Sequence, residues 1–329
     1  MAPVTKGFVP VLHAATRDRP DEIDTLVAVE AVATAVKELG YSTEIVALSS
    51  DLVEIEALPA RRPLLVFNLV DAVCGNGKLA PLVPARLDAS GIPYTGCGTS
   101  AWRETLSKVD TKVRLADTGL PTPIWSEDGT GLDPGAPAIV KPIWEHGSLG
   151  LDAASVVSGA EAPQAIAERN ACWQTEHFAE AYVGGREFNV SMLGSADGVE
   201  VLPIAEITFE DWQEGRPQIV DYEAKWVADS TAYAATPRRF GLEETDPALA
   251  ARLTLLAQAS WILFGLSSYA RIDFRVDAEG RPYILEVNVN PCLSPDAGFA
   301  AAAGERGLAY EDMIGRIVES SRGRLHVTT

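Results

Sequence analysis

The chain has 329 residues, of which 47% are apolar, and it carries a formal net charge of −19. This length allows two or three modules with cores of ordinary size, and the negative charge argues against binding to nucleic acid or to an anionic membrane. No apolar run approaches the about 20 residues that cross a bilayer, and the first residues lack a signal-peptide pattern. The cysteines form no CxxC pair, so we expect no disulfides, no zinc site and a cytoplasmic location.

The N-terminal part alternates between strand-like and helix-like patterns. Apolar periodicity predicts strands at 7–13, 43–48 and 63–70, and helices at 21–39 and 78–89. Strands that alternate with helices indicate a parallel sheet. The glycine-rich loop at 75–77 follows a predicted strand, where ligands often bind in such sheets. The alternative is that these residues form a plain turn.

A connector that contains several glycines, GIPYTGCG at 91–98, marks the first predicted module boundary. Beyond it we expect two short helices, at 99–106 and 108–118. The prolines of GLPTP at 119–123 then favour an extended crossing, because proline disfavours helix at the residue before it.

The next glycine-rich stretch follows a predicted strand, AIVKP, which places Lys141 near its end. The loop after it, EHGSLG at 145–150, contains Gly147 and Ser148. Backbone N–H groups in such a loop can wrap around phosphate oxygens. The glycines alone are weak evidence, and the preceding lysine strengthens the prediction of a phosphate site.

A glycine pair separates two strand-like runs in EAYVGGRE, which begins at Glu180 and ends at Glu187. The residues after Glu180 can present a backbone donor and acceptor to an adenine edge, and Glu187 can accept hydrogen bonds from ribose hydroxyls. Each glutamate, taken alone, is more often a surface residue. Further on, DYEAKW at 221–226 predicts a long loop, and such loops in compact domains are usually functional or disordered.

The stretch 270–289 predicts an antiparallel hairpin with its turn at 277–280. Alternation places Arg271 and Asp273 on one face of the first strand, and Glu286 and Asn288 share a face of the second. Two carboxylates and an amide are hard oxygen ligands, which suit Mg²⁺ beside nucleotide phosphates. The same spacing fits a solvated acidic hairpin at a sheet edge, but the interleaved apolar residues favour the magnesium–nucleotide site.

Taken together and in this order, these pieces resemble the ATP-grasp enzymes, and specifically the D-alanine–D-alanine ligase family. The pieces are GIPYTGCG, SKVDTK, GLPTP, AIVKP with GSLG, EAYVGGREF, DYEAKW, ARIDF and LEVNVNP. The resemblance implies an ATP-grasp fold of the α/β and α+β classes. It implies an N-terminal parallel α/β module at 1–98, followed by a central module at 99–182 and a C-terminal module at 183–329 that clamp ATP between them.

The resemblance also implies a role for each matching residue. The residues that would bind ATP are Lys108, Lys141, Gly147, Ser148, Glu180, Tyr182, Val183, Glu187 and Lys225. Those that would hold Mg²⁺, with two ions expected and Mn²⁺ able to substitute, are Asp273, Glu286 and Asn288. The catalytic residues would be Arg271, which stabilises an oxyanion, and Ser148 and Lys225, on loops that close over the reacting groups.

The N-terminal substrate positions depart from the family's pattern. Where the family has HGxxGEDG, this chain reads NLVDAVCGNGKLAP, with Asn68 and Asp71. The family's glycine-rich turn, with the glutamate that binds the first substrate's amine, is not visible. The stretch 13–24 offers only Arg17, Asp18, Asp21 or Glu22 in its place.

The C-terminal substrate positions depart as well. Trp226 stands where the family has a loop tyrosine, and the acceptor stretch reads VNPCLSPDAGF. In that stretch Asn290, Ser294 and Asp296 are candidate substrate residues, together with Trp226. An alternative of equal weight is that Asp296 is the N-cap of a helix at 297–303.

Because the nucleotide positions match and the substrate positions differ, we expect an unchanged reaction on different substrates. The expected activity is an ADP-forming carboxylate–amine ligase that activates an amino acid or related carboxylate as an acyl phosphate, in specialised metabolism. Two alternatives are open: a true D-alanine–D-alanine ligase of cell-wall synthesis, and an ATP-binding protein without ligase activity. Whether the nucleophile is an amine, a hydroxyl or a group of the same substrate is also open, as is homodimer formation. The expected partners are small-molecule substrates, and neither nucleic acid nor a membrane.

Overall fold

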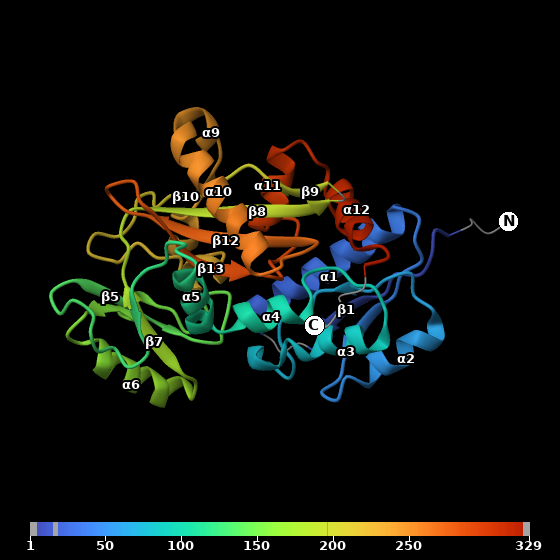
Figure 1. The fold of residues 1–329 in the computed structure, drawn as a ribbon, viewed down its shortest axis with the longest axis horizontal. Helices are drawn as coiled ribbons and strands as arrows, with labels where there is room; N and C mark the ends of the chain where they lie inside the picture. Colours follow the sequence, from blue (N-terminus) through green and yellow to red (C-terminus); the bar gives the residue numbers. More distant parts are fainter. Residues whose placement is uncertain (1–4, 16–18, 196, 325–329) are drawn as a thin grey trace.

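The computed structural model describes residues 5–15, 19–195 and 197–324. Within these described ranges, the strands form three separate sheets. Figure 1 shows the N-terminal sheet with α1, α2 and α3 at one end of the molecule, and the sheet that contains β5 and β7 at the other end with α6. The large sheet that contains β8, β12 and β13 lies above both of them in this view.

The N-terminal sheet is parallel, with the strand order β2-β1-β3, as the alternating pattern predicts. Its elements are β1 (Val11–Ala14), α1 (Pro20–Glu38), β2 (Ile45–Leu48), α2 (Val53–Arg61), β3 (Phe67–Asn68), η1 (Gly77–Leu79) and α3 (Leu82–Ser90). The strand expected at 63–70 is reduced to β3, although an isolated bridge joins Val66 to Tyr94. The helix expected at 78–89 is divided, because the Asn76 side chain accepts from the Lys78 N–H and begins a separate 3-10 turn.

The second sheet is antiparallel, with the order β4-β7-β5-β6. Its region contains α4 (Thr99–Leu106), α5 (Lys108–Asp117), β4 (Trp125–Ser126), β5 (Pro137–Pro142), η2 (Ala153–Ser155), β6 (Val156–Ser158), α6 (Ala162–Trp173) and β7 (His177–Ala181). Ser107 separates the first two helices, because its extended backbone ends α4 and its hydroxyl accepts from the Asp110 N–H. This cap places Lys108 at the first position of α5.

The third sheet is antiparallel and has six strands, with the path β11-β10-β8-β12-β13 and β9 paired to β8. The elements of this region are β8 (Arg186–Ser195), β9 (Gly198–Val201), β10 (Ala205–Ile207), α7 (Tyr222–Trp226), α8 (Thr231–Ala234), β11 (Arg238–Arg239), α9 (Leu242–Thr245), α10 (Pro247–Leu263), β12 (Tyr269–Val276), β13 (Pro282–Asn288), α11 (Gly298–Glu305) and α12 (Tyr310–Ser321). The expected loop at 221–226 contains the short helix α7, because Asp221 caps the Ala224 N–H.

The expected hairpin is confirmed as β12 and β13, and its register sets the site. Asp273 pairs with Glu286 and Arg271 with Asn288, before a bulge shifts the register after Asp273. The interpretation as an edge hairpin is wrong for β12, which lies between β8 and β13. Its alternate residue Ile272 is fully buried in the core that α10 shares, so the Arg271 and Asp273 side chains face the other way.

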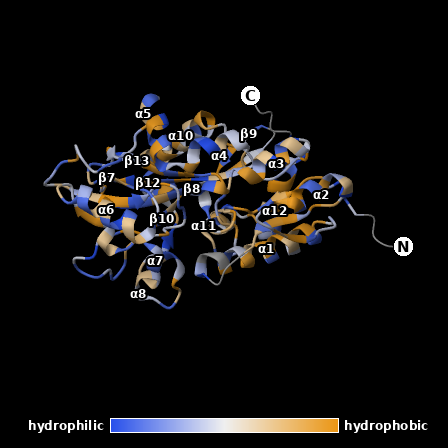
Figure 2. Ribbon diagram, turned by 90° about the horizontal axis from the view of Figure 1, so that it is seen from below, coloured by the Kyte–Doolittle hydropathy of each residue, from blue (hydrophilic) through white to orange (hydrophobic). Residues whose placement is uncertain are grey.

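One apolar cluster joins the first and last parts of the chain. Val32 and Val36 of α1 belong to the same buried cluster as Ile314 and Ile317 of α12. Figure 2 shows α1 and α12 next to each other, both with many hydrophobic residues. Tyr269 of β12 extends this cluster to the large sheet, so the N-terminal sheet is held against the end of the site hairpin. Among the helices of the described residues, none is both long enough and apolar enough to span a bilayer.

The turn between β7 and β8 provides a matched stability test. A Cβ on Gly185, whose φ is +103°, would lie 2.3 Å from the Val276 carbonyl oxygen, whereas a Cβ on Gly184 meets only the Tyr182 ring at 4.0 Å. Gly185→Ala should therefore lower the free energy of unfolding by at least about 1–3 kcal/mol, measured by urea denaturation. Gly184→Ala should cost less than about 1 kcal/mol, and equal losses would contradict the geometry.

Candidate active site

A cavity of about 930 Å³ lies between the second and third sheets and reaches α1, a volume that suits a small-molecule site. The residues that the sequence assigned to ATP, Mg²⁺, catalysis or the C-terminal substrate positions all line this one cavity. They are Lys108, Lys141, Gly147, Ser148, Glu180, Tyr182, Val183, Glu187, Lys225, Trp226, Arg271, Asp273, Glu286, Asn288, Asn290, Ser294 and Asp296.

Asp273 is the centre of a hydrogen-bond network on the polar face of the hairpin. Arg271 donates to both of its oxygens, with Nε 2.7 Å from Oδ1 and Nη2 2.8 Å from Oδ2. The amides of Asn288 and Asn189 donate to the same carboxylate, each at 2.9 Å. Sequence reasoning missed Asn189, which lies on β8 directly opposite Asp273, because only the sheet pairing brings it there.

Arg271 remains charged although the protein encloses it. Burial lowers its pKa, but the carboxylates of Asp273 and Glu286 more than reverse this effect and hold the pKa above its usual value. The guanidinium is therefore a fixed positive group beside the place where the two strands present their oxygen atoms.

Glu286 contacts two basic side chains, His146 from the loop after β5 and Lys108 from α5. Its Oε1 lies 2.6 Å from His146 Nδ1 and 3.3 Å from Lys108 Nζ. Burial raises the pKa of this carboxyl, but Lys108 and His146 together hold it well below its usual range. His146, in the glycine-rich loop, is a second residue that the sequence did not single out.

The donor set on the hairpin fits a hard divalent cation. Asp273 and Glu286 face each other across the strand pair, and the Asn288 amide donates to Asp273 through its nitrogen, which leaves its oxygen to accept. Among the described residues, no three His, Cys, Asp or Glu side chains form a metal cluster. The ligands that remain for Mg²⁺ would therefore be phosphate and water oxygens, which that ion commonly keeps.

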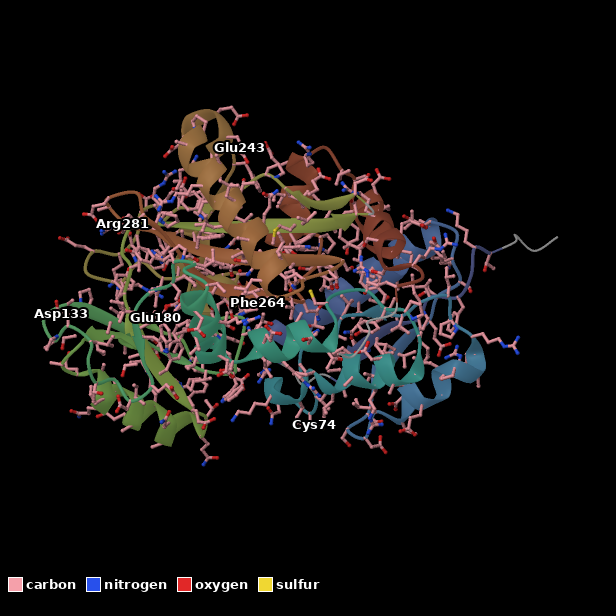
Figure 3. The ribbon with its side chains drawn as sticks, in the orientation of Figure 1. Cys74, Asp133, Glu180, Glu243, Phe264 and Arg281 are labelled. Atoms are coloured by element: carbon pink, nitrogen blue, oxygen red, sulfur yellow. The ribbon has the colours of Figure 1, made fainter. Side chains whose placement is uncertain are left out.

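Glu180 also lines the cavity and lies buried between two lysines. Its Oε1 is 2.6 Å from Lys141 Nζ, and its Oε2 is 2.5 Å from Lys112 Nζ. Burial raises the pKa of Glu180, but the two ammonium groups hold it below its usual value. Figure 3 shows Glu180 in the part of the molecule where the second sheet faces α5.

Lys112 was missed by the sequence analysis, although it lies in the SKVDTK stretch. It is only 1% exposed and also donates to the Thr122 hydroxyl at 2.8 Å. Its position four residues after Lys108 places both lysines on one side of α5. That helical spacing was the available signal.

The stretch after Glu180 is tied to the segment before α7. The Arg275 Nη2 lies 2.8 Å from a Glu187 oxygen and also donates to the Gln218 carbonyl. The Tyr182 hydroxyl donates to the same carbonyl at 3.1 Å. These contacts form one wall of the cavity.

The glycine-rich loop and α7 are closed on each other. The Ser148 hydroxyl donates to the Val220 carbonyl at 2.7 Å, and the Trp226 indole N–H donates to the Gly147 carbonyl at 2.6 Å. Lys225, next in the chain to Trp226, has its pKa lowered by burial and then by Arg271. The two loops thus cover one side of the cavity together.

The candidate substrate residues have different surroundings. Asn290 accepts from the Tyr269 hydroxyl at 2.6 Å and donates to the Val70 carbonyl at 3.2 Å, so it joins the segments that follow β13 and β3. Ser294 is buried, with its hydroxyl 3.2 Å from the Cys292 sulfur. Asp296 is exposed and does not cap α11, because the N-cap of that helix is Ala297; the N-cap interpretation is therefore wrong.

One carboxylate of the stretch 13–24 lines the cavity, and it is Asp24. The Cys292 thiol donates to Asp24 Oδ2 at 2.8 Å, and burial together with Asp24 raises the pKa of this thiol to about 12. Arg17 and Asp18 lie outside the described residues, and of Asp21 and Glu22 only the backbone is described.

Comparison with known proteins identifies the family. Residues 132–319 match the family described as "D-ala D-ala ligase C-terminus". The chain is 31% identical to the uncharacterized protein y4sG of Sinorhizobium fredii, over 90% of this chain and 87% of that one. It is also 31% identical to the D-alanine–D-alanine ligase of Actinobacillus pleuropneumoniae, over 88% of this chain and 91% of the relative.

Solved structures agree in fold. The D-alanine–D-alanine ligase from Bacillus anthracis, complexed with ATP, superposes with a TM-score of 0.75 at 21% identity and covers 96% of this chain and 97% of its own. The expected ATP-grasp architecture is thereby confirmed. On the family match and the sequence relatives, the chain belongs to the D-alanine–D-alanine ligase family of ATP-grasp enzymes.

Proposed function

We propose that the protein is an ATP-dependent ligase that activates an amino acid, or a related carboxylate, as an acyl phosphate and joins it to the amine of a second substrate. Family membership makes it an ATP-dependent ligase that forms a peptide bond. The observation that carries the proposal is that Lys108, Arg271 and the Asp273–Glu286 pair line one cavity.

The first step of the proposed reaction is attack by the substrate carboxylate on the γ-phosphorus of ATP. The transition state of phosphoryl transfer is stabilised mainly by position and charge, and Lys108, Lys141 and Ser148 line the cavity where the phosphates would lie. Bound Mg²⁺ would neutralise phosphate charge, held by Asp273, Glu286 and Asn288. We propose two such ions, with Mn²⁺ able to replace them.

In the second step the amine attacks the acyl carbon and phosphate leaves. Negative charge develops on the carbonyl oxygen, and Arg271 is a charged donor held in place by Asp273. Donors fixed before the reaction stabilise such an oxyanion without reorganisation. The Gly147 and Trp226 contact would keep water from the acyl phosphate.

The choice of substrates is a separate part of the proposal. We propose amino acids other than D-alanine, in specialised metabolism, because the substrate side of this cavity contains Asp24 and Cys292 rather than the family's pattern. The relatives named D-alanine–D-alanine ligase favour the alternative of a true D-alanine–D-alanine ligase. A homodimer is a further part of the proposal, and light scattering tests it.

An assay with a panel of amino acids tests the reaction and its substrates. With Mg-ATP and a panel of D- and L-amino acids, we expect ADP release together with equal amounts of a condensed product, measured by a coupled assay and mass spectrometry. Strong turnover with D-alanine alone would favour the cell-wall enzyme. Tight Mg-ATP binding with no ADP release on any mixture would favour the non-catalytic alternative. Mass spectrometry also distinguishes an amide from an ester or a cyclised product.

Arg271→Ala should lower kcat by roughly 10²–10³-fold, because one oxyanion donor is lost. The matched control is Arg281→Ala, on the same hairpin, whose side chain is 59% exposed and pairs with Asp277 outside the cavity. That control should keep the parent rate. A loss of less than tenfold in Arg271→Ala would contradict the assigned role.

Trp226→Phe removes the donor to the Gly147 carbonyl and keeps an aromatic ring. We expect the ratio of ADP to condensed product to rise above one, because water would reach the acyl phosphate when the loops separate. The control Trp261→Phe changes an indole on α10 that does not line the cavity. An unchanged ratio in Trp226→Phe would show that this contact does not keep water out.

A further inference from the structure

The first turns of α1 present large apolar side chains to the cavity instead of to a protein core. Ile23 is 52% exposed and Val27 is 49% exposed, and both line the cavity. By contrast, Val29, Val32 and Val36 on the same helix are at most 1% exposed. Apolar side chains that stay exposed together inside a concave site are a common mark of ligand contact.

This apolar wall, Ile23 with Val27, lies on the substrate side of the cavity. Asp24, between them in the sequence, is joined to Cys292 by the 2.8 Å contact, and Cys292 follows the hairpin strand that ends at Asn288. Two further apolar residues, Leu69 and Leu293, line the same cavity. The wall is therefore supplied by α1 and adjoins the segment that continues from the proposed metal site.

The polar groups assigned to the nucleotide come from other elements. Glu180 and Lys141 belong to the second sheet, and Glu187 to β8. None of these elements is α1. An occupant that contacts Ile23 and Val27 is thus a substrate other than ATP.

We infer that one of the two amino acid substrates carries a large apolar side chain, of the size of valine, leucine or phenylalanine, and that this side chain packs on Ile23 and Val27. The inference rests on the proposed ligase function and specifies its substrate. A methyl side chain such as that of alanine would leave most of this apolar surface in contact with water. The burial of apolar surface therefore favours the larger side chain.

The test measures ADP release with Mg-ATP and matched amino acids: alanine, valine, leucine and phenylalanine, each in both stereochemical forms. We expect kcat/KM to be at least about tenfold higher for a larger apolar amino acid than for alanine of the same hand, since apolar pockets discriminate by about tenfold or more for each methylene. Equal or higher kcat/KM for alanine overturns the inference and leaves the ligase function standing. If no amino acid supports ADP release, the ligase function itself is overturned, and the inference with it.

Substitutions in the wall give a second, independent readout. Ile23→Ala and Val27→Ala should each lower kcat/KM for the larger substrate by about tenfold, while kcat/KM for alanine and KM for ATP stay within about twofold. Ile23→Trp, which fills the space over the wall, should shift the preference toward alanine. The matched control is Leu255→Ala, because Leu255 is 66% exposed on α10 and does not line the cavity.

The wall could instead be covered by a second copy of the chain, and the same variants distinguish this. If Ile23→Ala changes the molar mass in light scattering and leaves the substrate preference unchanged, the wall is a subunit contact and the inference is wrong. Equal losses of kcat/KM for alanine and for the larger substrate would also overturn it, because they would indicate a general effect on the fold.

Discussion

The bidentate pair between Arg271 and Asp273 is the interaction on which the site depends. The two residues are alternate members of β12, so a single strand presents a charged donor and a carboxylate to the same side. Asn189 and Asn288, from the strands on each side, fix that carboxylate further. Because β12 lies inside the sheet and its opposite face is packed against α10, this polar face cannot turn away from the cavity.

Pairs of opposite charge also form at other buried positions in and beside the cavity. The protein has a net charge of −19, yet Lys108, Lys112 and Lys141 gather beside Glu180 and Glu286. An isolated charge in such a place would be costly, and a partner of opposite charge offsets that cost. An anionic nucleotide would thus enter a site whose positive groups are already oriented, against the field of an acidic surface.

The structural features that depend on local sequence pattern were predicted well. Alternation and a glycine turn predicted the hairpin and the shared face of Arg271 and Asp273. The glycine-rich loop after Lys141 lines the cavity. The sequence could not predict Asn189, His146 or Asp24, because each reaches the site through sheet pairing or contact between distant segments. Local pattern also misjudged the strand expected at 63–70, whose pairing partners limit it to two residues.

If an acyl phosphate links ATP to the new bond, an oxygen atom must pass from the substrate carboxylate to the released phosphate, and an oxygen isotope reveals this transfer. When the activated substrate carries ¹⁸O in its carboxylate, one labelled oxygen should pass to each phosphate released, because the oxygen that attacks phosphorus leaves with it. Mass spectrometry of the phosphate measures this transfer. We expect singly labelled phosphate at the yield of condensed product, and unlabelled phosphate alongside condensed product would contradict an acyl phosphate intermediate.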